Sequence, residues 1–163
     1  MTETEALLAF ARTHQVTVAA CESLTAGLFM ATLASVPGAS TVLRGGFVTY
    51  TNEMKQKLAH VEAGILNTEG AVSAACAAAM ASHTRELTGA DYAVSFTGNA
   101  GPSALEDKPA GLVYCAIDSR KRNRVCRYEF AHMSRNEVRE AVVEAMVTQL
   151  LAAMKEELNG QEI

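Results

Sequence analysis

The spacing of hydrophobic and polar positions changes several times along the chain, and each change predicts a new element. Helical spacing predicts helices over residues 2–13, 24–35, 52 onward, 73–87 and 134–158. Short runs rich in β-branched and apolar residues predict strands over residues 16–20, 45–51, 92–97, 112–118 and 125–130. Because helices and strands alternate, we expect one α/β domain over residues 1–163, a three-layer α/β/α sandwich with a mixed sheet.

Capping and turn residues set the expected boundaries. Thr51 or Asn52 is placed to begin the helix that follows the second strand, and Ser73 to begin the alanine-rich helix. Pro37 and Gly38 should end the helix over residues 24–35. A turn-rich loop is expected over residues 98–109, and a basic turn over residues 119–123 should join the last two strands as a hairpin.

Charge and composition narrow the classes of partner. The chain has 163 residues, 49% of them hydrophobic, and a formal net charge of −4, which does not favour nucleic acid or an anionic membrane. No apolar run approaches the roughly 20 residues of a membrane span. The first ten residues are acidic where a signal peptide is basic. We therefore expect a cytoplasmic protein that binds a small molecule.

The cysteines and histidines are dispersed without the spacing of a metal site. They are Cys21, Cys76, Cys115, Cys126, His14, His60, His83 and His132. Neither CxxC nor HExxH occurs, so we expect reduced thiols, no metal and no cofactor.

Ser23 follows the strand predicted over residues 16–20 and precedes a predicted helix. Two interpretations fit this position. A serine there can cap the helix, which is the commoner role. It can also act as a nucleophile, because free backbone N–H groups at a helix start can stabilise an oxyanion. The G-x-S-x-G elbow of α/β-hydrolases does not occur.

A nucleophilic serine needs a base, and Lys55 is the candidate. It falls in the first turn of a predicted helix, where the dipole disfavours an ammonium group, and burial would lower its pKa further. Serine–lysine pairs are a known variant of the catalytic triad. The alternative is a solvated surface lysine like Lys57. Tyr50, at the end of the preceding predicted strand, could relay a proton, or could be a tyrosine at the core edge.

The segment FTGNAGP, residues 96–102, follows the strand predicted over residues 92–97. Open α/β sheets bind ligands at such carboxyl ends, and glycine allows close approach of a backbone to a substrate. The segment is neither a Walker motif nor G-x-G-x-x-G, so a plain turn remains the alternative.

Six segments in order, ACESLTAGL, VPGAS, RGGFVTYTNEMK, EGAVS, GADYAVSFTGNAGP and KPAG, resemble the CinA C-terminal domain family. The similarity runs from about residue 16 to 151. It implies a three-layer α/β/α fold, usually oligomeric. The enzymatic members are nicotinamide-nucleotide amidohydrolases, which convert nicotinamide mononucleotide (NMN) to nicotinic acid mononucleotide and ammonia in pyridine nucleotide salvage.

The resemblance also implies the site. It puts the nucleophile at Ser23, the base at Lys55 and an assisting tyrosine at Tyr50, without metal. The residues it implies for substrate binding are Glu22, Thr25, Gly46, Thr97, Gly98, Asn99 and Gly101. In an acyl-transfer mechanism built on these residues, the oxyanion would lie against backbone amides near residues 24–25 or 97–98. The sequence leaves the phosphate-binding group open between a helix N-terminus and Arg44 or Arg139.

The sequence departs from the family pattern around the expected pocket. Leu24 and Ala26 replace a cysteine and a glycine, and Asn99 replaces an apolar residue. Residues 103–106, SALE, replace a glycine-rich run. These departures leave two alternatives open, an amidase for another small amide and a non-catalytic module linked to competence or DNA damage.

The alanine-rich helix over residues 73–87 has small side chains on several faces. Such a surface permits close packing, either against the sheet of the same chain or against a second copy. We expect a homo-oligomer.

Overall fold

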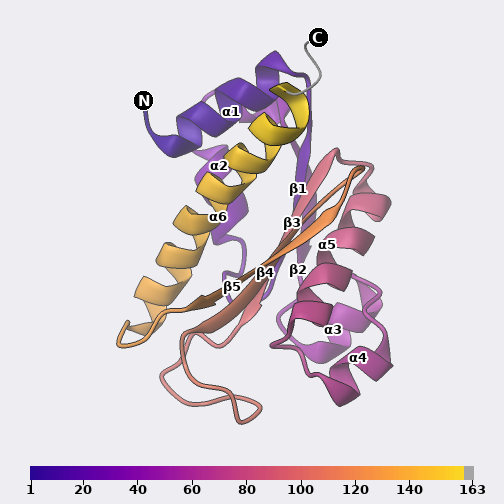
Figure 1. Ribbon diagram of the computed structural model, residues 1–163, viewed down its shortest axis with the longest axis vertical. Helices are drawn as coiled ribbons and strands as arrows, with labels where there is room; N and C mark the ends of the chain where they lie inside the picture. The colour runs from indigo at the N-terminus through magenta and orange to yellow at the C-terminus, as the bar shows by residue number, and fades with distance from the viewer. Residues whose placement is uncertain (160–163) are drawn as a thin grey trace.

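A computed structural model describes residues 1–159. Its central sheet has the order β2-β1-β3-β4-β5. The strands are β1 Val18–Glu22, β2 Leu43–Val48, β3 Tyr92–Gly98, β4 Leu112–Ser119 and β5 Asn123–Glu129. The helices are α1 Glu3–Thr13, α2 Leu28–Ala34, η1 Ala39–Thr41, α3 Asn52–Lys57, α4 Ala63–Thr68, α5 Ala74–Thr88 and α6 Arg135–Asn159. Helices α1, α2 and α6 cover one face, and α3, α4 and α5 lie on the other (Figure 1), which confirms the expected α/β/α sandwich.

The direction of each strand determines where a crevice opens. β1 is parallel to β2 and β3, whereas β4 is antiparallel to β3 and β5, so the sheet is mixed as expected. After β1 the chain crosses to β2 on one side, and after β3 it turns to β4 on the other. Neighbouring strands whose connections diverge in this way leave space outside their carboxyl ends. That space lies beyond Glu22 and Gly98.

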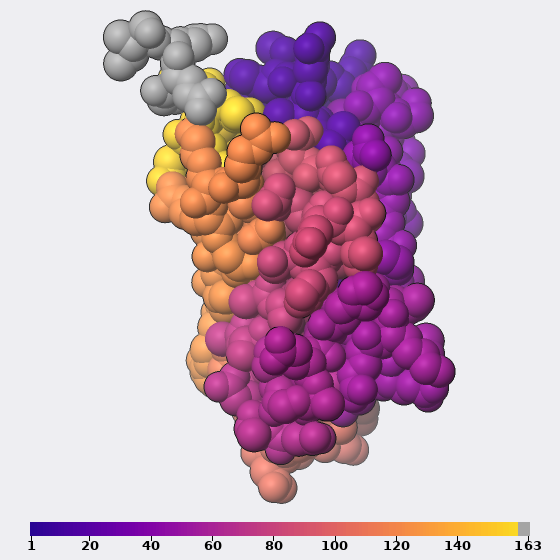
Figure 2. Space-filling model, turned by 90° about the vertical axis from the view of Figure 1, so that its right-hand side faces the viewer, coloured from indigo at the N-terminus to yellow at the C-terminus, as the bar shows by residue number. Residues whose placement is uncertain are grey.

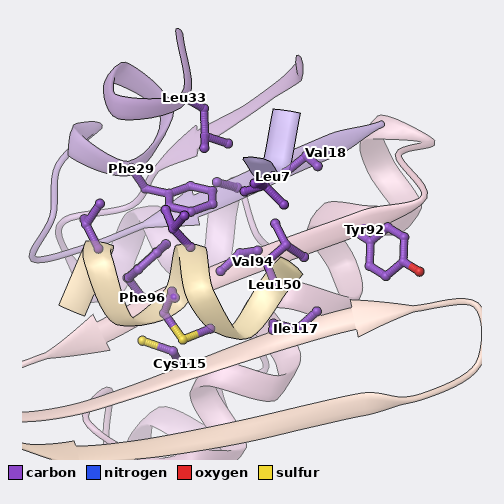
Figure 3. Close-up of a cluster of buried hydrophobic side chains, with 14 of the residues drawn as sticks. Leu7, Val18, Phe29, Leu33, Tyr92, Val94, Phe96, Cys115, Ile117 and Leu150 are labelled. Carbon is purple, nitrogen blue, oxygen red and sulfur yellow. The ribbon is translucent and has the colours of Figure 1, made fainter. Parts of the chain in front are cut away.

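The main core fills the layer between the sheet and helices α1, α2 and α6. Phe29 and Phe96 meet there with ring centroids 5.1 Å apart (Figure 3). The face of α6 expected to be apolar is buried, with Val142 and Leu150 fully enclosed. Burying a side chain of this size stabilises the fold by roughly 1.5–3 kcal/mol. This core fixes β1 and β3 side by side.

The alanine-rich helix α5 packs on the opposite face of the sheet, against β3 and β4. Its buried side includes Ala77 and Ala81, which allow the helix to lie close to the strands. Ser73 caps α5 as expected, since its side chain accepts a hydrogen bond from the Cys76 N–H. The small residues are therefore used within one chain, and self-association stays a prediction.

Several expected boundaries were wrong. The helix expected over residues 24–35 begins only at Leu28, because Ala26 and Gly27 adopt left-handed backbone angles that interrupt it. The second strand ends at Val48, so Tyr50 lies in a loop. Helix α4 was not expected.

No helix within residues 1–159 is both long and apolar enough to cross a membrane.

Ala26 offers a test of this turn. Its φ is 47°, in the left-handed region. There a Cβ atom raises the conformational energy by about 1–2 kcal/mol, whereas glycine adopts these angles without a steric clash. We expect Ala26→Gly to raise the free energy of unfolding by about 0.5–1 kcal/mol, measured by urea denaturation. Ala78→Gly, within the regular helix α5, should lower it by about 1 kcal/mol. A loss at both positions would contradict the strain at Ala26.

Candidate active site

Ser23 lies at the first position beyond β1, between the ends of two neighbouring strands. Its N–H donates to the Phe96 carbonyl of β3 at 2.9 Å. On the other side, the Glu22 carbonyl accepts the Thr49 N–H at 2.9 Å, just beyond β2. Ser23 is therefore fixed by both parallel neighbours. It is mostly buried, and its side chain lines a small cavity.

Glu22, not Ser23, serves the start of helix α2. Its buried carboxylate accepts hydrogen bonds from the N–H groups of Phe29 at 2.9 Å and Met30 at 3.1 Å. The N-cap residue of α2 is Gly27, which has no side chain that could accept a hydrogen bond. The capping interpretation of Ser23 was therefore wrong. Glu22, expected to contact substrate, has both carboxylate oxygens bound to α2 and lies outside the cavity lining.

Lys55 reaches Ser23 from helix α3. The helix begins beside β2 because the Thr51 side chain accepts the Met54 N–H, which makes Lys55 its fourth residue and turns the side chain toward the sheet. Lys55 Nζ lies 2.9 Å from Ser23 Oγ and 2.9 Å from the Thr49 carbonyl oxygen. Lys55 is only 2% exposed. The surface-lysine alternative is therefore wrong.

Burial lowers the pKa of the Lys55 amine, because the protonated form loses its hydration. The charges that oppose this effect are those of Cys76, Cys21 and Glu106. Burial raises the pKa of the Cys76 thiol to about 11 and also raises that of Cys21, so both thiols stay neutral near pH 7. Lys55 forms no ion pair with any acid among residues 1–159. The site therefore favours the neutral amine.

The cavity in front of the pair has a volume of about 150 Å³. Its lining combines polar groups with apolar walls: Ser23, Leu24, Tyr50, Asn52, Lys55, Ala71, Val72, Thr97, Gly98, Asn99, Ala100, Leu105 and Arg135. Three of its sides come from the ends of β1 and β3 and from α3. A ring-sized group fits this space with its remaining atoms outside.

Arg135, which the sequence analysis did not consider, connects Tyr50 to the loop after β3. One guanidinium nitrogen donates to the Tyr50 hydroxyl at 2.7 Å and another to the Gly101 carbonyl at 2.6 Å. A signal for it exists in the sequence. Arg135 is the first residue of α6, where the helix dipole disfavours a cation, as at Lys55.

The loop after β3 is held by its own polar groups. The Thr97 hydroxyl donates to the Ala71 carbonyl at 2.7 Å, and Asn99 bonds to the backbone of Ser103 and Gly101. A Cβ atom at Gly98 would lie 2.8 Å from Leu112 backbone, so only glycine fits there. Thr97, Gly98 and Asn99 line the cavity as expected, whereas Gly101 does not.

The backbone N–H groups of Thr25 and Gly98 are candidates to hold an oxyanion next to Ser23. The Arg139 guanidinium donates to the carbonyls of Leu24 at 2.9 Å and Thr25 at 3.1 Å. Because a trans peptide directs its N–H away from its C=O, this contact turns the Thr25 N–H away from Arg139. In β3 the Asn99 N–H donates to Leu112 of β4, so the alternation of the ladder turns the Gly98 N–H toward β1.

Other expected site residues lie elsewhere. Gly46 is inside β2, where a Cβ atom would collide with the Ala20 carbonyl oxygen, so close strand packing explains this glycine. Arg44 lies near the opposite end of that strand and donates to the Thr88 carbonyl, so it is remote from the cavity. Arg139 is engaged by the turn carbonyls, which leaves Arg135 as the arginine of the lining.

The sequence matches the family model for the CinA C-terminal domain over residues 2–154. The chain belongs to the CinA C-terminal domain family. A putative competence-damage inducible protein of a Geobacillus strain is 54% identical over 103 residues, which are 63% of this chain and 25% of that protein. The one from Lactiplantibacillus plantarum is 43% identical over 88% of this chain and 34% of its own length. The chain thus spans about a quarter to a third of these curated relatives.

Solved structures agree with this CinA assignment. A CinA superfamily protein from Klebsiella pneumoniae superposes with a TM-score of 0.91 at 28% identity, covering 94% of this chain and 96% of that one. The competence/damage inducible protein CihA from Agrobacterium tumefaciens superposes with a TM-score of 0.86 at 34% identity, covering 93% and 96%. Within residues 1–159 of this CinA domain, no group of three or more His, Cys, Asp or Glu side chains could hold a metal ion.

Thr25 provides a test of what the turn does. Expected to contact substrate, it is fully buried, lies outside the cavity lining, and its hydroxyl has no hydrogen-bond partner in the described part of the chain. Thr25→Val removes the unpaired hydroxyl at constant shape, so we expect the free energy of unfolding to rise by about 1 kcal/mol.

Thr25→Ala is the matched control for this substitution. It also removes the hydroxyl but loses a buried methyl group, so thermal unfolding should occur at a lower temperature than in Thr25→Val. A Thr25→Val protein less stable than the unaltered chain would mean that the hydroxyl is bonded.

Proposed function

We propose that this CinA domain hydrolyses a small carboxamide by acyl transfer to Ser23, with Lys55 as general base and NMN as the substrate. The observation that carries the proposal is the 2.9 Å approach of Lys55 Nζ to Ser23 Oγ inside a site that favours a neutral amine. A neutral lysine has a lone pair that can take the hydroxyl proton.

The first step forms an ester and releases ammonia. Ser23 Oγ attacks the amide carbon while its proton passes to Lys55 Nζ, and the C–O bond forms as the carbonyl becomes an oxyanion. The Thr25 and Gly98 N–H groups are the donors we assign to that oxyanion. The protonated Lys55 then gives its proton to the leaving nitrogen, the C–N bond breaks and ammonia departs. Lys55 is neutral again.

Water completes the reaction by the same route. Lys55 takes a proton from the water, whose oxygen attacks the ester carbon, and the proton returns to Ser23 Oγ as the C–O bond breaks. The Thr49 carbonyl, 2.9 Å from Nζ, keeps the amine directed at Ser23 through both steps. The carboxylic acid leaves as the product.

The choice of NMN rests on the resemblance and on three features of the cavity. Its volume of about 150 Å³ suits one pyridine ring with the carboxamide directed at Ser23. Its walls include Leu24, Val72 and Leu105, which are apolar. Arg135 at the lining supplies positive charge for the phosphate, in place of the Arg44 or Arg139 contact considered from the sequence. Tyr50 would then orient Arg135 rather than relay a proton.

Substitution of the pair tests the mechanism. Ser23→Ala and Lys55→Arg should each reduce ammonia release from NMN by at least about a thousandfold, as nucleophile and base removal do in related chemistry. Arginine keeps the charge but cannot deprotonate in this range. The measurement is ammonia release by purified protein, with circular dichroism showing that each variant is folded.

Lys57→Arg is the matched control. Lys57 is one of the exposed residues of the same helix and pairs with Glu53 at 2.6 Å, so its replacement should leave turnover within about twofold. An active Lys55→Arg protein, or equal losses at both lysines, would refute the assignment of the base. If the protein releases ammonia from another small amide but not from NMN, the substrate is that other amide and NMN is wrong. No amide hydrolysis at all would favour the non-catalytic alternative.

The pH dependence of turnover provides an independent test. Because burial lowers the pKa of Lys55, its neutral form is more abundant at a given pH than that of a solvated lysine. Turnover should rise with pH through this lowered pKa and level off above it, at a lower pH than the usual lysine pKa near 10.4 would give. If turnover rises only around the ordinary lysine pKa, the pKa of the catalytic base is not lowered, which would contradict the assignment of buried Lys55 as that base.

A further inference from the structure

The segment SALE, residues 103–106, borders the cavity through Leu105 and takes no part in the acyl-transfer steps. It belongs to the loop between β3 and β4, which protrudes at the end of the molecule that carries α3 and α4 (Figure 2). Leu105 lines the cavity and is 50% exposed. Half of this apolar side chain is therefore exposed to water beside the cavity, which is unfavourable unless a ligand covers it.

Two oppositely charged side chains fasten this loop to the segment before α5. The Glu106 carboxylate accepts the N–H groups of Ala71 and Val72, both at 3.0 Å. The Lys108 ammonium donates to the carbonyls of Glu69, at 2.8 Å, and Val72. All four partners are backbone groups. We call these contacts of Glu106 and Lys108 the clip, and they fix the path of the loop.

Glycine at position 70 makes room for this clip. A Cβ atom there would lie 2.4 Å from a Glu106 carboxylate oxygen, and Gly70 has a φ of 85°. The close contact between residues 69–72 and residues 103–108 therefore requires glycine at position 70.

The loop is also braced internally. Leu105 and Lys108 exchange two backbone hydrogen bonds of 3.1 and 2.9 Å, and the Asn99 side chain donates to the Ser103 carbonyl at 2.9 Å. Glu106 and Asp107 have φ values of 55° and 57°, which non-glycine residues adopt only when their surroundings impose it. The clip and the brace together hold Leu105 at the cavity.

We propose that Leu105 is a specificity-determining residue that covers the flat ring of an aromatic carboxamide bound in the cavity. The proposal rests on the proposed function and deepens it by naming the feature of the substrate that is selected. When the ring enters, the exposed half of the Leu105 side chain leaves water, which favours a ring over a short aliphatic group. Glu106 and Lys108 are positioning residues, since they act through Leu105.

The test measures binding separately from chemistry. In a Ser23→Ala background, which cannot turn over, NMN and ribose 5-phosphate are titrated by calorimetry against proteins with and without Leu105→Ala. Loss of the covering side chain should weaken NMN binding roughly tenfold. Binding of ribose 5-phosphate, which lacks the ring, should not change. Lys108→Ala should weaken NMN binding in the same direction.

Kinetics in the chain with Ser23 intact give a second readout. Leu105→Ala should raise KM for NMN roughly tenfold and leave kcat within about twofold, since the lost contact is the same in ground and transition states. Leu87→Ala is the matched control, because Leu87 is 48% exposed on α5 and lies outside the cavity lining. It should change neither constant.

The outcomes separate this inference from the proposed function. Equal NMN affinity with and without Leu105, equal weakening of both ligands, or no NMN binding by either protein overturns the role of Leu105. A chain that hydrolyses NMN with an unchanged KM in Leu105→Ala refutes only this inference. Ring-dependent loss of binding in a chain that releases no ammonia refutes only the hydrolytic function.

Discussion

A buried amine that pairs with no acid in the part of the chain that the structure describes is the constraint on which the site depends. Lys55 is held against Ser23 Oγ and the Thr49 carbonyl, and a neutral amine suits both contacts better than an ammonium group that has lost its water. A carboxylate next to Lys55 would raise its pKa and stabilise the ammonium form. Cys21 and Cys76, whose pKa values are raised by burial, surround the amine without supplying a negative charge near pH 7.

The sheet brings this arrangement about through its connections. The chain leaves β1 in one direction and β3 in the other, which opens the space that Ser23 and Gly98 border. Glu22 ties the start of α2 to the end of β1, and Arg139 holds the turn between them from α6. Thus two charged side chains that do not line the cavity fix the backbone next to Ser23. Position, and not contact with a ligand, explains why they are there.

The sequence predicted the layers because they follow a local rule, the hydrophobic period. Residue type at an element's end made Ser23 and Lys55 candidates, but it left a helix cap and a surface lysine as alternatives, and the resemblance to the CinA C-terminal domain family selected the pair. Prediction from the sequence failed where the tertiary structure decides. Residues 24–27 have helical composition, yet left-handed angles at Ala26 and Gly27 delay α2. The capping of α2 by Glu22 spans seven residues and could not be distinguished from capping by Ser23. Arg135 is distant in sequence from every motif, although its position at a helix start was a usable signal.

The burial of Lys55 has a consequence for how the protein matures. Ser23 and Lys55 both belong to the first 55 residues, but the cavity lining around the amine includes Val72, Asn99 and Ala100, which are synthesised later. A nascent or partly unfolded chain therefore carries an ordinary, solvated lysine beside an ordinary serine. In the proposed mechanism, the reactivity of Ser23 therefore depends on the long-range closure of the sheet that buries Lys55.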